Sequence, residues 1–171
     1  MAETVEGWDG FADWLKKLEG QIVSINFNLA FTEIEAVLEQ AHQQRFLSKK
    51  TPTGNSWPEW FFTTPENPLH DTLEVSGKLR ESLQMGGDGH ISTKTENELI
   101  WGTNVKYAGI HNYGATITTG IWLMARGGKW RLPPGSTLHI PQREFMGLNE
   151  EITEDIETIL LDNATAQLAG P

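Results

Sequence analysis

The chain has 171 residues and a formal net charge of −10, from 13 Lys and Arg against 23 Asp and Glu. Hydrophobic residues make up 38% and charged residues 21%, which is typical of a folded globular chain and excludes a disordered one. The apolar runs are too short for a membrane-spanning helix, and the acidic first residues do not resemble a secretion signal. The chain has no cysteine, which excludes disulfides, thiolate nucleophiles and cysteine-based zinc sites.

The charge is unevenly distributed along the chain. Residues 1–40 carry a net charge of −6 and residues 144–171 one of −7, whereas residues 41–143 carry +3. Residues 126–131 hold three cations, Arg126, Lys129 and Arg131, and no acid. An acidic exterior repels phosphates, so DNA binding over the whole surface is disfavoured. The basic stretch is either a solvated loop paired with an acidic neighbour or a local contact with nucleic acid.

The first predicted element is a short amphipathic helix between Gly7 and Gly20, with two lysines on its wet side. Its apolar stripe needs a partner surface, either the core of the same chain or another subunit. The stripe consists of Trp8, Phe11, Trp14, Leu15 and Leu18.

A longer helix is predicted from an apolar stripe that begins near residue 29 and ends near residues 49–50. Thr32 and Glu35 have the spacing of a capping box, so the helix starts there or one turn earlier. Lys49 and Lys50 suit the negative end of the helix dipole. The stripe consists of Leu29, Ile34, Val37, Leu38, Ala41 and Phe46.

Sequence patterns in the middle of the chain predict several short helices, strands and loops. Residues 51–72, rich in proline and aromatics, are expected to form a long ordered loop, and residues 76–83 a short helix with Ser76 as N-cap. Glycines at 86–89 indicate a turn, and alternation predicts antiparallel strands around residues 91–95 and 99–101. One or two helical turns over residues 107–113 end at Gly114. Residues 115–119 and 137–140 are expected to be strands, with a basic Gly- and Pro-rich loop over residues 120–135 between them.

A final helix is predicted from about Leu148, with acids opposite an apolar stripe, and residues 167–171 are expected to fray. Helices at both ends with strands between them predict an α+β fold, a small antiparallel β-sheet packed with the N-terminal and C-terminal helices. We expect an N-terminal arm over residues 1–25, a domain over residues 26–166 and a frayed tail. The final stripe consists of Ile152, Ile156, Ile159, Leu160 and Asn163.

The sequence predicts no catalytic, metal or cofactor site. The five histidines lack the spacing of a helical metal pair or of H-E-x-x-H. Residues 75–78 lack the earlier glycine that a phosphate-binding loop needs, and no G-x-S-x-G elbow occurs. Acid pairs such as Glu150 and Glu151 fall on the wet face of a helix, where solvent screens them. The histidines are His42, His70, His90, His111 and His139.

Four motifs stand out in a fixed order. They are Phe46 followed by PTGNSW at residues 52–57, LEVSGKLRESL at 73–83, WGTNVKYAGIHNYG at 101–114 and IPQREFMGL at 140–148. In this order they resemble the phage virion morphogenesis (tail completion) family of Mu-like and related tailed phages. That family shows P-x-G-x-x-W, L-x-x-[ST]-G-x-L-x-x-S, G-[ST]-x-x-x-Y-A-x-I-H-x-x-G and P-x-R-x-[FW]-L-G. Glu144 and Met146 depart from its usual Pro and Leu, and residues 1–25 lie outside the pattern, as a lineage-specific arm would.

The resemblance implies a tail-terminator-like structural protein of the virion head–tail junction, assembled in the host cytoplasm, and not an enzyme. It would complete the tail or sit in the neck as a ring subunit, a hexamer given the six-fold symmetry of tails. The implied partners are further copies of itself, the tail tube or sheath, and neck or connector proteins. DNA in the lumen would be contacted without sequence preference through Arg126, Lys129 and Arg131. No cofactor and no membrane are implied.

The motif residues suit structural or assembly roles. Gly102 and Gly114 bracket a tight segment whose Tyr107, Ile110 and Tyr113 can pack inward. His111 is interpreted as a hydrogen-bonding wedge between that segment and a strand, and Arg143 as a clasp within the fold or an assembly contact. The full candidate set is Pro52, Gly54, Trp57, Gly77, Gly102, Tyr107, His111, Gly114, Pro141 and Arg143.

Two alternatives belong to other classes. A small phage-encoded hydrolase would use a glutamate with His111 or His139 in a concave site. A glycan-binding module would stack sugars on exposed tryptophans, namely Trp8, Trp14, Trp57 and Trp60.

Overall fold

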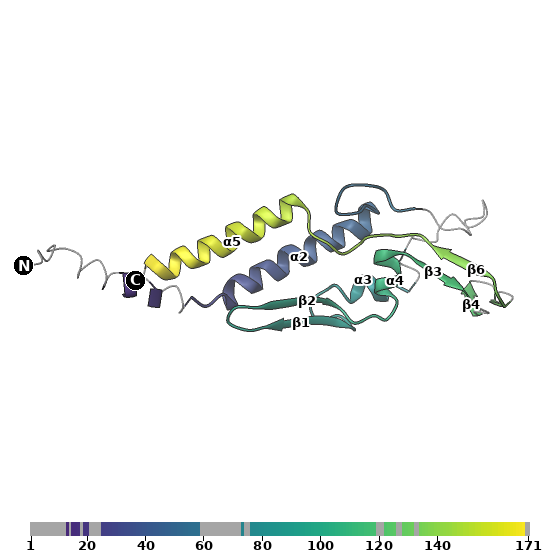
Figure 1. Ribbon diagram of the computed structural model, residues 1–171, viewed down its shortest axis with the longest axis horizontal. Helices are drawn as coiled ribbons and strands as arrows, with labels where there is room; N and C mark the ends of the chain where they lie inside the picture. Colours follow the sequence, from purple (N-terminus) through teal and green to yellow (C-terminus); the bar gives the residue numbers. More distant parts are fainter. Residues whose placement is uncertain are drawn as a thin grey trace, which may run out of the picture.

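The structure is a computed structural model that describes residues 13, 15–17, 19–20, 25–58, 73, 76–118, 122–125, 128–131 and 134–169, with backbone alone at 122–125 and 128–131. Two long helices lie side by side over a strand hairpin, and further strands project from one end of this body (Figure 1). The predicted α+β class is confirmed. The elements in chain order are α2 (Asn28–Ser48), α3 (Lys78–Glu81), β1 (His90–Lys94), β2 (Leu99–Thr103), α4 (Ala108–Tyr113), β3 (Ala115–Thr118), β4 (Trp122–Ala125), β5 (Gly128–Arg131), β6 (Thr137–Ile140) and α5 (Glu150–Ala169).

The helix α2 begins at Asn28, a turn before the predicted capping box, and ends as predicted near Lys49, which is left-handed at φ 55°. The capping box is wrong, because Thr32 lies inside the helix and its hydroxyl donates to the Asn28 carbonyl at 3.3 Å. Glu35 instead pairs with Lys94 at 2.5 Å and accepts a hydrogen bond from Ser92, both on β1. The start of α2 is held from outside, where the Phe27 N–H donates to the Glu96 carbonyl at 3.0 Å.

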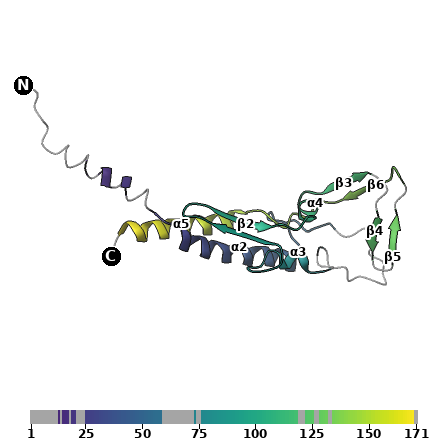
Figure 2. The same cartoon turned by 90° about the horizontal axis from the view of Figure 1, so that it is seen from below.

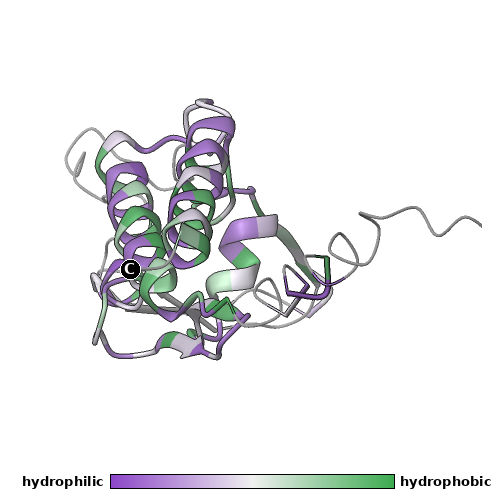
Figure 3. Cartoon of the chain, turned by 90° about the vertical axis from the view of Figure 1, so that its left-hand side faces the viewer, coloured by the Kyte–Doolittle hydropathy of each residue, from purple (hydrophilic) through white to green (hydrophobic). Residues whose placement is uncertain are grey.

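The first core cluster lies between α2, α5 and β2. Phe31, Ile34 and Leu38 of α2 and Ile152 of α5 are buried in it. Viewed along the long axis, the two helices lie next to each other (Figure 3). The predicted stripes therefore pack as expected, with the exception of Leu29, which is 76% exposed.

Within the described residues, the strands form three two-stranded antiparallel sheets. The β1–β2 hairpin confirms the predicted pair and aligns His90 with Thr103. Strands β3 and β6 form a second pair, which we call the ribbon, in the register Ala115 to Ile140. Strands β4 and β5 form a third pair that we call the basic hairpin. Its register aligns Ala125 with Gly128, so the predicted loop over residues 120–135 is wrong there.

The basic hairpin escaped prediction because glycine and proline composition outweighed the strand pattern. Residues 122–125 are apolar, and a two-residue connection leaves only residues 126–127 between Ala125 and Gly128. Two-residue connections are the commonest ones in β-hairpins. Figure 2 shows this hairpin beyond the ribbon, at the far end of the molecule from α5's C-terminus.

The ends of the body lie together. Gln167 of α5 accepts from the Asn26 N–H at 3.0 Å and donates to the Asn26 carbonyl at 2.8 Å. The helix α5 continues to Ala169, so the tail that we expect to fray begins within it. The described residues of the arm, which are residues 13, 15–17 and 19–20, are helical. The arm's tryptophans and residues 59–72 lie outside the described residues.

Candidate assembly site

The four sequence motifs meet in one apolar cluster, which we call the motif core. Phe46 packs edge-on against Trp57 at 5.5 Å between ring centroids, and its centroid lies 5.6 Å from that of Phe145. Phe46, Leu83 and Phe145 are fully buried. Each motif thus contributes side chains to one cluster that no single stretch of sequence could form. Its members are Phe46, Trp57, Leu79, Leu83, Val105, Ala108 and Phe145.

The loop over residues 49–57 returns Trp57 to the end of α2. The Trp57 N–H donates to the Lys49 carbonyl at 2.8 Å, and the Gly54 N–H to the Thr51 carbonyl at 2.9 Å. Gly54 has a φ of +84°, a conformation that favours glycine. The indole N–H of Trp57 then donates to the Glu144 carbonyl at 3.1 Å. The first motif therefore reaches the last one through a side chain.

Asn112 joins α4 to the last motif. Its Oδ1 accepts from the N–H groups of Phe145 and Met146, at 3.0 and 2.9 Å. One residue earlier, the His111 carbonyl accepts from the Arg143 N–H at 2.7 Å. Asn112 is 6% exposed. These bonds hold residues 143–146 against α4, and we call them the clasp.

Arg143 is part of this clasp inside the chain. It is 1% exposed, and its Nε donates to the Pro58 carbonyl at 2.8 Å. Burial lowers the pKa of Arg143 and of Arg45 from their usual value. The position agrees with the clasp interpretation, because a side chain this buried has little surface to offer a neighbour.

Two buried polar residues of α2 were not singled out from the sequence. Arg45 Nη1 donates to the Gly147 carbonyl at 2.7 Å and to the Phe145 carbonyl at 3.3 Å. The same nitrogen lies 3.2 Å from His42 Nε2, while His42 Nδ1 donates to the Leu38 carbonyl. The available signal was their spacing, because residues 38, 42 and 45 share the buried face of a helix.

Burial sets the protonation of His42. The pKa of His42 is lowered to about 4, mainly by desolvation; the hydrogen bond to the Leu38 carbonyl raises the pKa, and the nearby Arg45 charge lowers it. His42 is therefore neutral at pH 7, with the proton on Nδ1 and Nε2 free to accept from Arg45. Together with Arg45, His42 links α2 to the residues that precede α5.

Gly114 is the glycine that the clasp requires. Its φ is +73°, and a Cβ there would lie 3.0 Å from the Gln142 nitrogen and 3.1 Å from the Ile140 oxygen. At Gly102 an added Cβ would make an ordinary 3.5 Å contact with Met146. Gly77, at φ +70°, takes the N-cap position of α3 that was predicted for Ser76. That prediction is wrong, although the Ser76 hydroxyl accepts from the Lys78 N–H at 3.4 Å.

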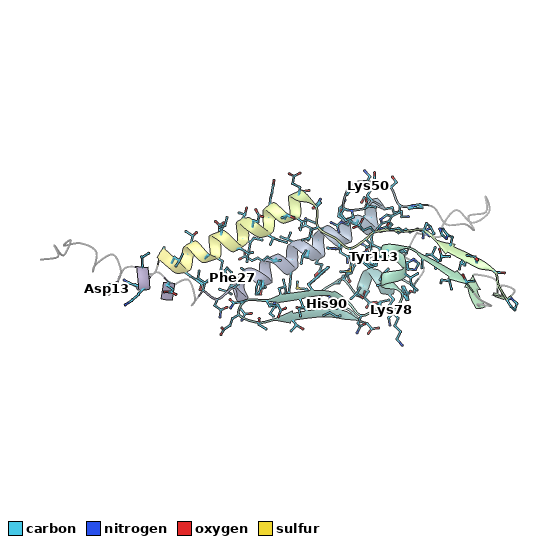
Figure 4. All side chains as sticks on the ribbon, in the orientation of Figure 1. Asp13, Phe27, Lys50, Lys78, His90 and Tyr113 are labelled. Atoms are coloured by element: carbon cyan, nitrogen blue, oxygen red, sulfur yellow. The ribbon has the colours of Figure 1, made fainter. Side chains whose placement is uncertain are left out.

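The inward face of α4 differs from the prediction. Tyr113 is 76% and Tyr107 38% exposed, whereas Ala108 and Asn112 are buried. A helix of six residues has room for one buried pair four residues apart. The His111 ring contacts Tyr107 edge-on at 5.8 Å, and its buried Nδ1 lacks a partner among the described residues. His111 therefore connects to the last motif through its backbone. Tyr113 lies on the body near the ribbon (Figure 4).

The ribbon has one apolar and one polar face. Its register aligns Ala115 with Ile140 and Ile117 with Leu138, and all four are only half-buried. On the other face, the Thr116 hydroxyl lies 2.7 Å from His139 Nδ1. Lys129 and Arg131 occupy alternate positions of β5, and Arg126 lies outside the described residues. The backbone at Lys129 and Arg131 thus belongs to the basic hairpin beyond the ribbon (Figure 2).

The described residues offer little to the alternative functions. Burial and then the Arg143 charge lower the pKa of His111, so its charged neighbour is a cation and not a carboxylate. In the part of the chain that the structure describes, no group of three His, Cys, Asp or Glu side chains could hold a metal ion. Trp57 is 6% exposed, so its place in a sugar-stacking surface is wrong. Among the same residues, no helix is long and apolar enough to cross a membrane.

These features define a small α+β protein whose motif residues bind its own segments together beside a projecting ribbon. A model of the phage virion morphogenesis family matches residues 7–164, and the chain belongs to that family. It is thus a protein of phage virion morphogenesis, as the resemblance implied. The match includes residues 7–25, which corrects their interpretation as a segment outside the family pattern. Searches of curated proteins and of solved structures found no match.

Proposed function

We propose that this virion protein is a ring subunit of the head–tail junction, a hexamer, that completes the tail and allows it to join the head. The family supports a role in virion morphogenesis. The half-buried apolar face of the ribbon is the observation that supports association into a ring. A two-stranded ribbon is marginally stable by itself, and the apolar face formed by Ala115, Ile117, Leu138 and Ile140 is only half-buried in the single chain.

A neighbouring subunit would cover that face. In a closed ring each subunit presents two different surfaces, one to each neighbour. The ribbon would be one of them, because it projects from the body (Figures 1 and 2). Its strands begin after Gly114 and end before Pro141. The clasp fixes the ribbon's base, so the direction of projection is set before assembly.

The basic hairpin would face the lumen or the next ring. Lys129 and Arg131 lie on β5 at the tip of the molecule, in a chain whose net charge is −10. In the proposed ring both cations would contact the phosphate backbone of DNA in the lumen. Such contacts carry no sequence information. The tail tube or sheath and the neck or connector proteins are the other proposed partners.

The decisive experiment is electron microscopy of particles produced without this protein. Full heads beside unjoined tails are expected, and the length of those tails distinguishes a tail terminator from a neck adaptor. Joined particles of normal appearance would refute the proposal. Native mass spectrometry of the purified protein then tests the six-fold ring, and a monomeric lytic activity would favour the hydrolase alternative.

Charge removal tests the basic hairpin separately. Replacing Arg126, Lys129 and Arg131 with Ser should leave the fold intact and impair head–tail joining. The matched control replaces Lys50, Lys78 and Lys106 with Ser, which removes the same charge from exposed positions on the body. If both triple variants join equally well, the basic hairpin has no part in joining.

A further inference from the structure

An open apolar groove of about 560 Å³ lies between α2, α5 and β2. Its lining includes Phe31, Ile34 and Leu38 of α2, Leu99 of β2, and Ile156 and Leu160 of α5. The volume falls within the range of roughly 300–1,000 Å³ found for cavities that enclose drug-sized groups. The groove can therefore admit more than one aromatic side chain.

One lining residue indicates that the groove lacks a cover in the single chain. Leu148, just before α5, is 57% exposed although its side chain is large and apolar. A partner that packs apolar side chains on Leu148 would remove this surface from water.

The N-terminal arm has the side chains that such a groove takes. Its sequence predicts an apolar helix face with Trp8, Phe11, Trp14, Leu15 and Leu18. Three aromatic side chains can bury roughly 450–750 Å², close to the ~800 Å² that each partner buries in a stable interface. The family match begins at residue 7, so this face belongs to the family's region of the chain.

In the single chain the described part of the arm does not occupy this groove. Its described residues are helical and all exposed, including Leu15 at 44%. They lie beyond Phe27, outside the layers of the body, where Asp13 marks them in Figure 4. Figures 1 and 2 agree on that position. The described part of the arm is therefore available to another molecule.

We infer that residues 8–18 of one copy bind in the groove between α2, α5 and β2 of the next copy. Each subunit then gives one arm and receives one, a head-to-tail contact that repeats around a closed ring. The inference rests on the association of copies in the proposed function and does not depend on where in the virion the ring lies.

Cysteine cross-linking tests the contact directly, because the natural chain has no cysteine. A tagged Leu15→Cys chain is mixed with an untagged Leu148→Cys chain and treated with a short bis-maleimide. The matched control partner is Leu161→Cys, which is also on the α5 side and 66% exposed but does not line the groove. Tagged–untagged dimers should form at least about tenfold faster with the groove partner, because docking raises the local concentration.

Two results would overturn the inference. Equal yields with Leu148→Cys and Leu161→Cys would show that the arm does not select the groove. In a chain that carries both Leu15→Cys and Leu148→Cys, cross-linking within one chain, with no dimers or larger species, would place the arm in its own groove.

A size measurement separates this inference from the proposed function. Leu148→Glu should reduce the ring population in native mass spectrometry, whereas Leu161→Glu should not. Rings that persist with both variants, together with failed cross-linking, would refute the arm contact and leave the proposed ring intact. The proposed ring itself would be refuted if the natural chain were monomeric in native mass spectrometry and also bound to isolated tails as single copies.

Discussion

Replacement of Asn112 gives the sharpest test of the clasp. In Asn112→Ala, the N–H groups of Phe145, which is buried, and of Met146, which is partly buried, lose their acceptor. An unsatisfied buried donor costs about 1–3 kcal/mol and a partly buried one costs less, so the free energy of unfolding should fall by roughly 2–4 kcal/mol. Asn112→Leu, which keeps the volume but not the acceptor, should cost a similar amount.

Urea denaturation followed by tryptophan fluorescence and circular dichroism provides the measurement. With an m-value of roughly 2 kcal/mol per molar, the midpoint should fall by about 1–2 M. Asn97→Ala is the control, because Asn97 is exposed, and surface substitutions usually change stability by less than about 0.5 kcal/mol. If the Asn112 variants unfold at the same urea concentration as Asn97→Ala, Asn112 does not hold the last motif to α4.

Three further substitutions test other parts of the structure. Gly114→Ala should destabilise the fold by roughly 1–3 kcal/mol, because the new Cβ would meet the Gln142 nitrogen at 3.0 Å; Gly109→Ala, where a Cβ meets nothing within 4 Å, should not destabilise it in thermal melts. The pKa of His42 is about 4 in the folded chain and 6.5 in an unperturbed histidine. Between these pH values the unfolded chain binds a proton at His42 and the folded chain does not. Stability from His42 is therefore complete above pH 6.5 and falls by about 3 kcal/mol towards pH 4, and parallel pH profiles for the natural chain and His42→Gln would contradict this. Burial by itself raises the pKa of Glu35, but the hydrogen bonds from Lys94 and Ser92 outweigh it and lower the pKa. Lys94→Met should thus cost roughly 3–5 kcal/mol by leaving the Glu35 carboxylate without its cation, and the double variant with Glu35→Gln should recover most of that loss in chemical denaturation; no recovery would refute the pairing.

The sequence predicted those elements whose side-chain period is strong. The stripes of α2 and α5, the β1–β2 pair and the stop at Gly114 all follow from local spacing. The start of α2 at Asn28 also falls within the predicted range, one turn before Thr32, but the bond from the Phe27 N–H to the Glu96 carbonyl, which is distant in the sequence, could not be predicted.

The clasp could be anticipated only as a set of motifs. Arg45 reaches the Phe145 and Gly147 carbonyls across 100 and 102 residues of chain. Acceptors of this kind are backbone oxygens, which every residue has, so no sequence pattern identifies them. The exposure of Tyr113 could not be predicted either. An aromatic residue in a short helix is expected to be buried, but the six residues of α4 bury Ala108 and Asn112 instead.

The way in which the ribbon is anchored has a mechanical consequence. Both of its strands enter the body at one place, where Gly114 lies against Ile140 and Gln142, and where the Arg143 N–H bonds to the His111 carbonyl. A pull on the ribbon's tip would therefore be shared by both chain crossings and pass into α4 and residues 143–146. These segments are tied to each other and to α2, so tension from a neighbouring part would spread through the helical body instead of peeling one strand from the other.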